Sequence, residues 1–269
     1  MEPNTLIFSD LIDSETEFIP LLSSEDEEAM NTEEVPEILP ILPLRNTVLF
    51  PGVVIPITVG RDKSIKLIRE YYKGSRTIGV VAQKDANIED PEFDDLNKIG
   101  TVAYIIKILQ MPDGSNTAII QGKRRFAISE MIQSEPYIMA SVTAFEAPVV
   151  IPTDNGEFSA LIASLKDLAI QIITKSPNIP SEAAFAIKNI ESPSFLVHFI
   201  SSNLNVDLTE KQKLLEVADL VECANLVLTL LTKELQVADL KQQIQNKVKT
   251  DLDKQQRDFL LNQIGRAHV

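Results

Sequence analysis

The stretch Leu42–Arg61, LPLRNTVLFPGVVIPITVGR, decides the fold of this chain. Two short apolar runs rich in β-branched residues flank a Pro51-Gly52 turn, and such runs favour buried strands. The prolines at 43, 51 and 56 lack a backbone N–H, so they place the breaks in the hydrogen-bond ladder. The stretch therefore predicts two short strands joined by a tight turn at the start of a β domain.

The same stretch carries a long pattern, P-L-R-[ND]-x-V-[LV]-F-P-x-x-x-x-P-[ILV]-x-[VI]-[GE]-R, which is met in full from Pro43 to Arg61. The pattern resembles the start of the amino-terminal domain of the Lon (endopeptidase La) family of ATP-dependent proteases. Later segments are similar to that family as well: the run 100–103, the turn 112–114, and Gln121-Gly122 followed by residues 124–126. The alternative is an ordinary β-hairpin of an unrelated domain, which would not need so long a match.

Residues 39–147 alternate like a small β domain with one helix. Asp62 is a candidate N-cap, and Gly74 ends the helical spacing that follows it. Strands are expected at 77–82, at 101–109 paired with 117–120, at 125–132 and at 137–145. Several short strands with a single helix favour a closed or nearly closed barrel, which hides its edges. The Lon resemblance implies that this domain, residues 38–148, is a PUA-like pseudo-barrel.

From Glu157 onward the apolar period becomes helical, so an α-helical bundle is expected over residues 149–218. Ser192 followed by Pro193 predicts a helix start. Thr209 with Gln212 forms a capping-box pattern, and Asp219 with Glu222 forms a looser one with an acidic cap. The predicted fold class is therefore α+β, a β barrel followed by helices.

Residues 219–263 contain no Gly or Pro, so they predict one long helix. Its first half is rich in apolar residues, whereas beyond Leu240 only a narrow apolar seam remains, which is typical of a strut or coiled-coil arm. This segment resembles the helix that joins the Lon amino-terminal region to its ATPase ring. Residues 264–269 are expected to be a non-native tail, with Gly265 as a helix breaker.

The net charge of −14 is distributed unevenly along the chain. Residues 1–37 hold 12 acidic residues and no Lys or Arg, which leaves 27 acidic against 25 basic residues for the remainder. The first 37 residues therefore predict a disordered acidic arm. Two apolar clusters interrupt the arm, Leu6–Ile12 and Phe18–Leu22, and they are either docking motifs or solvated tail. The nearly neutral remainder disfavours nucleic-acid binding, which asks for a basic face.

Motifs for catalysis and metal binding are missing from these 269 residues. There is no Gly-x-x-x-x-Gly-Lys-Ser/Thr loop and no Gly-x-Ser-x-Gly elbow. His198 in an apolar run favours a core or bundle-edge histidine, and Cys223 favours a buried helical residue. Lys123-Arg124-Arg125 is interpreted as a solvated basic turn, with a nucleic-acid contact as the alternative. We assign no catalytic, cofactor-binding or metal-binding residue, and the polypeptide-binding residues stay unknown.

The Lon resemblance implies the substrate-recognition and assembly region of a homohexameric, ATP-dependent serine protease. Unfolded or degron-bearing polypeptides are the implied partners. ATP, Mg²⁺ and the serine–lysine dyad are implied for the intact parent only, so this chain should bind polypeptide without hydrolysing ATP or peptides. A stand-alone adaptor and a PUA-like RNA-binding protein are the alternatives. A single cysteine and the absence of an 18-residue apolar run predict a cytoplasmic protein without a membrane span.

Overall fold

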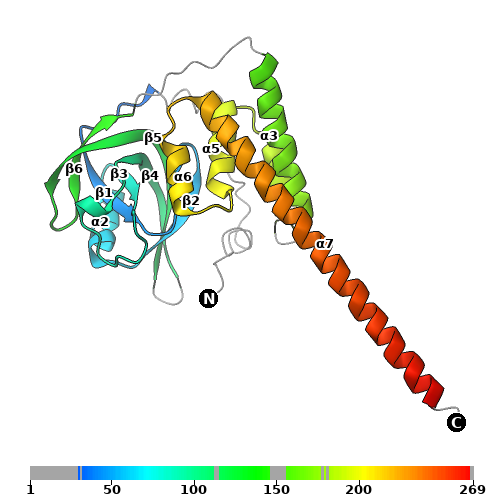
Figure 1. Cartoon of the computed structure of the whole chain (residues 1–269). Coiled ribbons are helices and arrows are strands. Elements are labelled where there is room, and N and C mark those ends of the chain that lie inside the picture. The colour runs from blue at the N-terminus through cyan, green and yellow to red at the C-terminus, as the bar shows by residue number, and fades with distance from the viewer. Residues whose placement is uncertain are drawn as a thin grey trace.

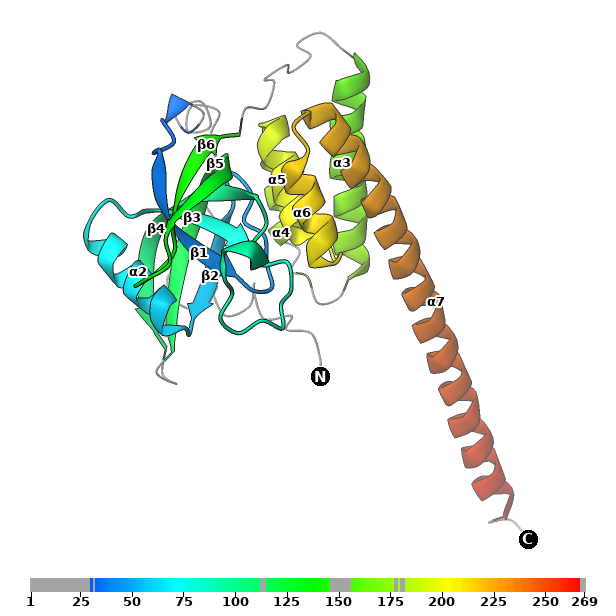
Figure 2. The same cartoon turned by 60° about the vertical axis from the view of Figure 1, so that its left-hand side comes forward.

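The computed structural model describes residues 30, 32–111, 115–145, 156–176, 179 and 182–266. A β barrel lies beside a group of helices, and the last helix leaves the group as a long rod (Figure 1). Turning the molecule shows the whole group of helices on one side of the barrel (Figure 2). This arrangement confirms the predicted α+β class, with a barrel followed by helices.

The barrel is one mixed sheet in the order β2-β5-β4-β3-β1-β6, closed by an additional β5–β6 pairing. The pair β1–β3 is parallel and the other pairs are antiparallel. Closure leaves β2 as a strand with a free edge, and a proline there removes one donor. The strands are β1 (Ile38–Leu44), β2 (Val54–Val59), β3 (Thr77–Ala82), β4 (Ile99–Gln110), β5 (Asn116–Gln133) and β6 (Met139–Ala144).

The predicted hairpin of 101–109 with 117–120 is confirmed as part of the β4–β5 pair. Its expected turn, 112–114, lies outside the described residues. A separate strand at 125–132 is wrong, because β5 continues for 18 residues from Asn116 to Gln133. Register shifts in the β4–β5 and β5–β6 pairs bend the ladder where the sequence analysis expected a break. One strand therefore serves both halves of the barrel.

Helix α2 (Asp62–Lys73) lies between β2 and β3 and ends at Gly74 as predicted. Asp62 is not its N-cap. Arg61 holds that position with extended backbone and no side-chain cap, and Asp62 is the first helical residue. An acidic residue in the first turn still favours the helix, because it faces the positive end of the helix dipole.

The helical part contains α3 (Gly156–Lys175), α4 (Glu182–Asn189), α5 (Pro193–Asn203), α6 (Leu208–Glu216) and α7 (Leu220–Arg266), while a short 3₁₀ turn, η1 (Phe93–Asp95), belongs to the barrel. Ser192 caps α5 as predicted, since its hydroxyl accepts a hydrogen bond from the N–H of Phe195 at 3.1 Å. Asp219 is confirmed as the cap at the start of α7, because its carboxylate accepts a hydrogen bond from the N–H of Glu222 at 2.8 Å.

The predicted capping box at Thr209 and Gln212 is wrong. Asp207 is the N-cap of α6, and its carboxylate accepts from the N–H of Glu210 at 2.8 Å. Gln212 is instead buried against the barrel, where its Nε2 donates to the carbonyl of Ile99 at 3.0 Å. The contact with β4 therefore occupies the side chain that the pattern assigned to capping.

The long helix is confirmed, and at 47 residues α7 measures about 70 Å. Its first half packs along α3, and an ion pair between Lys175 and Asp239 joins them near the C-terminal end of α3 (Figure 1). The expected end at 263 is wrong by three residues, because α7 passes Gly265 and ends at Arg266. An apolar, exposed seam follows the ion pair, formed by Val237, Leu240, Ile244, Val248 and Leu252.

Most of the expected acidic arm, residues 1–29 and 31, lies outside the described residues. Its last residues contradict the boundary at 37. Met30 is only 6% exposed, the carboxylate of Glu33 pairs with Lys123 at 3.5 Å, and the N–H of Val142 donates to the carbonyl of Glu37 at 2.9 Å. These contacts attach the end of the arm to the barrel.

Candidate functional surface

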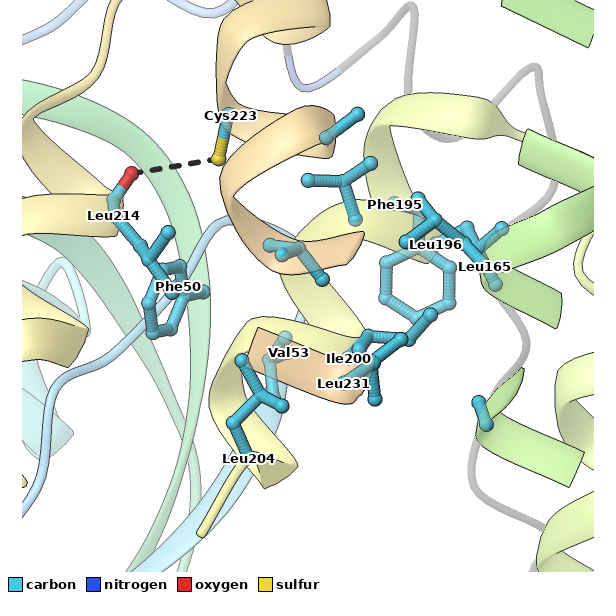
Figure 3. Close-up of a cluster of buried hydrophobic side chains, with 14 of the residues drawn as sticks. Phe50, Val53, Leu165, Phe195, Leu196, Ile200, Leu204, Leu214, Cys223 and Leu231 are labelled. Carbon is cyan, nitrogen blue, oxygen red and sulfur yellow. Dashed lines mark hydrogen bonds between the residues drawn. The ribbon is translucent and has the colours of Figure 1, made fainter. Parts of the chain in front are cut away.

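Part of the stretch that carries the family pattern is buried between the barrel and the helices. Val48, Phe50 and Val53 belong to the same apolar cluster as side chains of α3, α5, α6 and α7. Phe50 is fully buried, and Figure 3 shows it with Val53 beside the side chains of Leu204, Leu214 and Leu231. These three residues of the pattern stretch therefore lie at the junction of two structural units, and their buried side chains are not available to a partner.

The backbone of this loop is fixed by the strands on which it lies. Thr101 is fully buried, and its hydroxyl donates to the carbonyl of Leu49 at 2.6 Å. Gly52 donates to the carbonyl of Gly122, and Gly122 donates back to the carbonyl of Val53, both at 2.9 Å. Gly52 has φ 76°, a left-handed conformation that favours glycine. A Cβ at Gly122 would lie 2.2 Å from the Phe50 carbonyl oxygen, so only glycine permits this approach.

The last arginine of the pattern also has a role inside the barrel. Arg61 Nη2 donates to the side-chain oxygen of Gln83 at 2.6 Å. Gln83 is fully buried, and its Nε2 donates in turn to the carbonyl of Ile88 at 3.0 Å. This chain of hydrogen bonds holds the loop after β3 against the start of α2.

The Lys123–Arg125 segment is not a solvated turn, because it lies within β5. Arg125 Nη1 donates to the carbonyls of Leu215 at 2.7 Å and Val217 at 2.5 Å, which lie at the end of α6. Its guanidinium also stacks 4.7 Å from the ring centre of Phe145. Arg125 therefore ties the barrel to the helices, and the nucleic-acid alternative loses its strongest residue.

His198 and Cys223 are confirmed as packed residues of the helices. The ring of His198 lies 6.2 Å from that of Phe50, and burial lowers the pKa of His198 to about 3, with a smaller contribution from Arg125. Cys223 is 3% exposed, and burial raises the pKa of its thiol to about 11. Its sulfur lies 3.6 Å from the carbonyl oxygen of Leu214 (Figure 3). A neutral imidazole and a buried thiol suit packing rather than chemistry.

Within the described ranges, no group of three or more His, Cys, Asp or Glu side chains is arranged to hold a metal ion. A search of the same residues for helices that could span the membrane also found none.

One candidate surface is the outer side of β2, β5 and β4. Cross-strand partners in an antiparallel sheet point to the same side. Ile105 and Ile120 are partners with no exposure, so they define the inner side. The adjacent rows must then point outward. We call their apolar members the outer β-face: Val54, Pro56, Tyr104, Ile106, Leu109 and Ile119.

The outer β-face forms three successive rows across the three strands. Val54, Gln121 and Tyr104 form the first row, Pro56, Ile119 and Lys107 form the second, and Thr58, Thr117 and Leu109 form the third. Ile106 is the additional residue of a bulge beside Lys107, and it is 38% exposed. At strand spacings of about 4.8 Å and row spacings of about 6.8 Å, the rows cover roughly 10 by 14 Å.

Ile106 of the outer β-face is exposed, and its other five side chains are partly exposed. In the part of the chain that the structure describes, none of the six belongs to the three buried clusters or to the side chains packed on them. Lys107 is the only charged side chain in the rows, and it is exposed. The sequence analysis could not find this face, since it depends on strand register rather than on a motif.

Other large apolar side chains are exposed elsewhere. Ile38, Met131 and Ile132 flank β6 at 42 to 51% exposure, and Phe185 on α4 reaches 68%. Met131 and Ile132 lie on β5 itself, but at its far end, where β5 pairs with β6 and not with β2 or β4. Ile132 serves below as the control position.

Comparison with known proteins places the chain in a family. The family model described as "ATP-dependent protease La (LON) substrate-binding domain" matches residues 38–233. Among curated relatives, the Lon protease of Flavobacterium johnsoniae is 58% identical over 252 residues, which cover 93% of this chain and 31% of that protein. The Lon protease of Cytophaga hutchinsonii is 50% identical over 254 residues, covering 94% and 31%. The chain thus spans about a third of the length of these relatives.

Two solved structures have the same fold. The N-terminal domain of the Mycobacterium avium complex Lon protease superimposes with a TM-score of 0.59 at 21% identity, covering 72% of this chain and 98% of that one. The Lon N-terminal domain protein of Xanthomonas campestris gives 0.52 at 17% identity, covering 71% and 97%.

Proposed function

The chain belongs to the family of Lon (endopeptidase La) substrate-binding domains, and from this premise we propose that it binds unfolded or degron-bearing polypeptides through the outer β-face. The observation that carries the proposal is the partly exposed apolar surface on β2, β5 and β4. Unfolded polypeptides differ from folded ones in exposing large apolar side chains. An apolar surface that is not part of the core is therefore suited to recognise them.

The binding strength expected for one such face is low. Covering two large apolar side chains yields about 3 to 6 kcal/mol, and association costs at least about 4 kcal/mol. A single domain should therefore bind polypeptide weakly. Several copies in one assembly would compensate, because each additional contact to the same client is intramolecular. Weak single contacts also allow a client to be released for transfer.

The proposal is tested with the double variant Ile106→Thr/Ile119→Thr. Threonine is β-branched and keeps strand propensity while it removes apolar area. Binding of fluorescently labelled, reduced and carboxymethylated lactalbumin is measured by anisotropy. We expect at least fivefold weaker binding for this variant, and less than a twofold change for the control Ile132→Thr, which is 51% exposed beside β6. Equal affinity of the double variant and the wild type would refute the role of this face.

ATP hydrolysis and peptide cleavage are proposed for the remaining part of the intact protein, together with ATP and Mg²⁺. The support is the sequence itself, which carries neither a phosphate-binding loop nor a serine-nucleophile motif. Purified chain should release no phosphate from ATP and no peptides from casein. ATP-dependent cleavage by pure material would contradict this part of the proposal.

Assembly into a homohexamer in the intact protein is proposed to involve the exposed part of α7. The apolar seam from Val237 to Leu252 recurs every three to four residues and is about half exposed. Sedimentation at increasing concentration should show self-association that the variant Leu240→Ser/Ile244→Ser loses.

We also propose a cytoplasmic location for the protein, and this proposal rests on its single cysteine.

A further inference from the structure

We propose that the acidic arm, residues 1–29, is an intramolecular ligand of the outer β-face and competes there with client polypeptides. This inference rests on the proposed function for its consequence, since it concerns the same face. The arm was left open in the sequence analysis as either a docking segment or solvated tail. Three observations favour docking on this face: where the arm is anchored, how far it reaches, and which charges and apolar groups it carries.

The anchor lies at the edge of the outer β-face. Lys123 and Arg124 lie at the register shift of the β4–β5 pair, two and three residues beyond Gln121 of the first row. Lys123 pairs with the carboxylate of Glu33 at 3.5 Å, and Arg124 donates to the carbonyl of Glu33 at 2.9 Å. Met30 is buried three residues earlier. Glu33 is therefore held two to three residues along β5 from the first row of the face.

The reach of the arm matches the length of the face. From Lys123 to Thr117 there are six residues of strand, or about 20 Å. The cluster Phe18–Leu22 lies about ten residues before Met30, and ten residues of random coil would span about 16 to 19 Å. The cluster Leu6–Ile12 lies about twenty residues before Met30, which gives about 22 to 27 Å. Tethered binding is strongest when the linker's mean length equals the distance to be bridged.

The chemistry of the arm also fits the face. Both clusters supply large apolar side chains, and the arm carries acidic residues without any Lys or Arg. The rows of the face hold a single charge, the exposed Lys107, and Lys123 stands at their edge. The anchor already combines a buried apolar residue, Met30, with an acidic residue, Glu33, paired to lysine. The upstream clusters repeat this combination, so the same surface chemistry should attract them.

The consequence is a threshold for client binding. A tethered segment competes at an effective concentration of about 1 mM. It multiplies the apparent dissociation constant of a client by a factor, which is one plus the ratio of that concentration to the arm's own dissociation constant. If the arm's own dissociation constant is about 0.2 mM, client binding is therefore weakened about sixfold. Clients with several apolar segments would still displace it, whereas a short exposed segment would not.

The test compares the full chain with a variant that lacks residues 1–29 and with Phe18→Ser/Ile19→Ser/Leu21→Ser/Leu22→Ser. Both variants keep Met30 and Glu33, so the anchor is unchanged. Binding of labelled carboxymethylated lactalbumin should tighten about fivefold in both. Equal client affinity in all three proteins would overturn the inference, because no competitor would then be present.

A labelled peptide of residues 1–29, added to the shortened protein, measures docking without any client. It should bind with a dissociation constant of about 0.2 mM, more weakly at high salt, and lose most of its affinity in Ile106→Thr/Ile119→Thr but not in the control Ile132→Thr. Peptide binding that ignores the double substitution would overturn the inference. If clients need the face but the peptide does not bind, the inference fails and the proposed function stands. If the peptide needs the face but no client binds, the docking stands and the proposed function fails.

Discussion

The loop Leu49–Val53 and the outer β-face follow each other on the chain, yet the two regions are built by different rules. The loop has side chains in the main core, backbone bonds on both sides and a left-handed glycine at 52, and it lies against Gly122, where no Cβ fits. The face has partly exposed side chains that, among the described residues, belong to none of the three buried clusters. Neighbouring segments of the chain thus serve architecture and surface separately. Most apolar positions of the recognisable motif lie in the part that holds the fold together, and of the six residues of the proposed binding surface only Pro56 is a fixed position of that motif.

The largest effect should come from Phe50→Ala, which tests the loop side of the comparison. Phe50 is fully buried between β strands and helices, so its removal leaves a cavity in the shared cluster. We expect a loss of about 4 kcal/mol in the free energy of unfolding, measured by urea titration. A loss below about 1 kcal/mol would show that the barrel and the helices do not depend on this contact.

Gly122→Ala should have the next largest effect. The new Cβ would meet the Phe50 carbonyl oxygen at 2.2 Å, and backbone cannot yield as a flexible side chain does. We expect a loss of about 1 to 3 kcal/mol in the free energy of unfolding, comparable to overpacking in a core. The matched control is Gly60→Ala, where no atom lies within 4 Å of the added Cβ. Similar losses for both would contradict a specific need for glycine at 122.

A pH titration sharpens the comparison at the junction itself. Burial lowers the pKa of His198 to about 3, whereas unfolded histidine titrates near 6.5, so the unfolded state binds more protons between these values. The contribution of the neutral His198 to the free energy of unfolding is therefore fully present above about pH 7, and it declines as the pH falls. By pH 5 the decline from His198 should be about 2 kcal/mol. The variant His198→Gln should lose that part of the decline between pH 7 and pH 5, measured by urea titration at both values.

Two truncations test where the arm ends. Removal of residues 1–37 takes away Met30, the partly buried Val35 and the bond from Val142 N–H to the Glu37 carbonyl. This should cost about 2 kcal/mol and lower the melting temperature by about 5 °C. Removal of residues 1–29 alone should leave the melting temperature within about 1 °C. Equal melting temperatures for both truncations would show that the contacts of residues 32–37 do not stabilise the barrel.

The smallest effect should be that of Ile106→Thr on the face side of the comparison. Ile106 is a bulge residue with 38% exposure and no place in a buried cluster. We expect a change below about 0.5 kcal/mol in the free energy of unfolding, as for other surface positions. A loss as large as that of Phe50→Ala would show that the face belongs to the core.

Local chemistry predicted the elements whose causes are local. The caps at Ser192 and Asp219, the glycine end of α2 and the long helix without Gly or Pro depend on neighbours within a turn or two. The barrel class followed from the number and length of alternating runs. The buried state of Cys223 followed from its helical, apolar surroundings.

Contacts between distant segments caused the errors. Gln212 is engaged by the carbonyl of Ile99 on β4, so Asp207 caps α6 instead. Arg125 looked like part of a solvated turn because its acceptors, at Leu215 and Val217, are about 90 residues away. The outer β-face requires knowledge of which rows face outward, and a bulge at Ile106 shifts those rows by one residue. The sequence of one strand does not determine how that strand is paired with its neighbours.

The fusion of α7 to the barrel has a mechanical consequence. Val227 and Leu231 of α7 share one cluster with Phe50 and Val53, and no linker intervenes between this cluster and the rod beyond Asp239. The rod acts as a lever of about 40 Å, so a tilt of about 10° at its base moves its far end by about 7 Å. Tension on a polypeptide held by the barrel would travel along this lever as torque rather than being absorbed by a hinge.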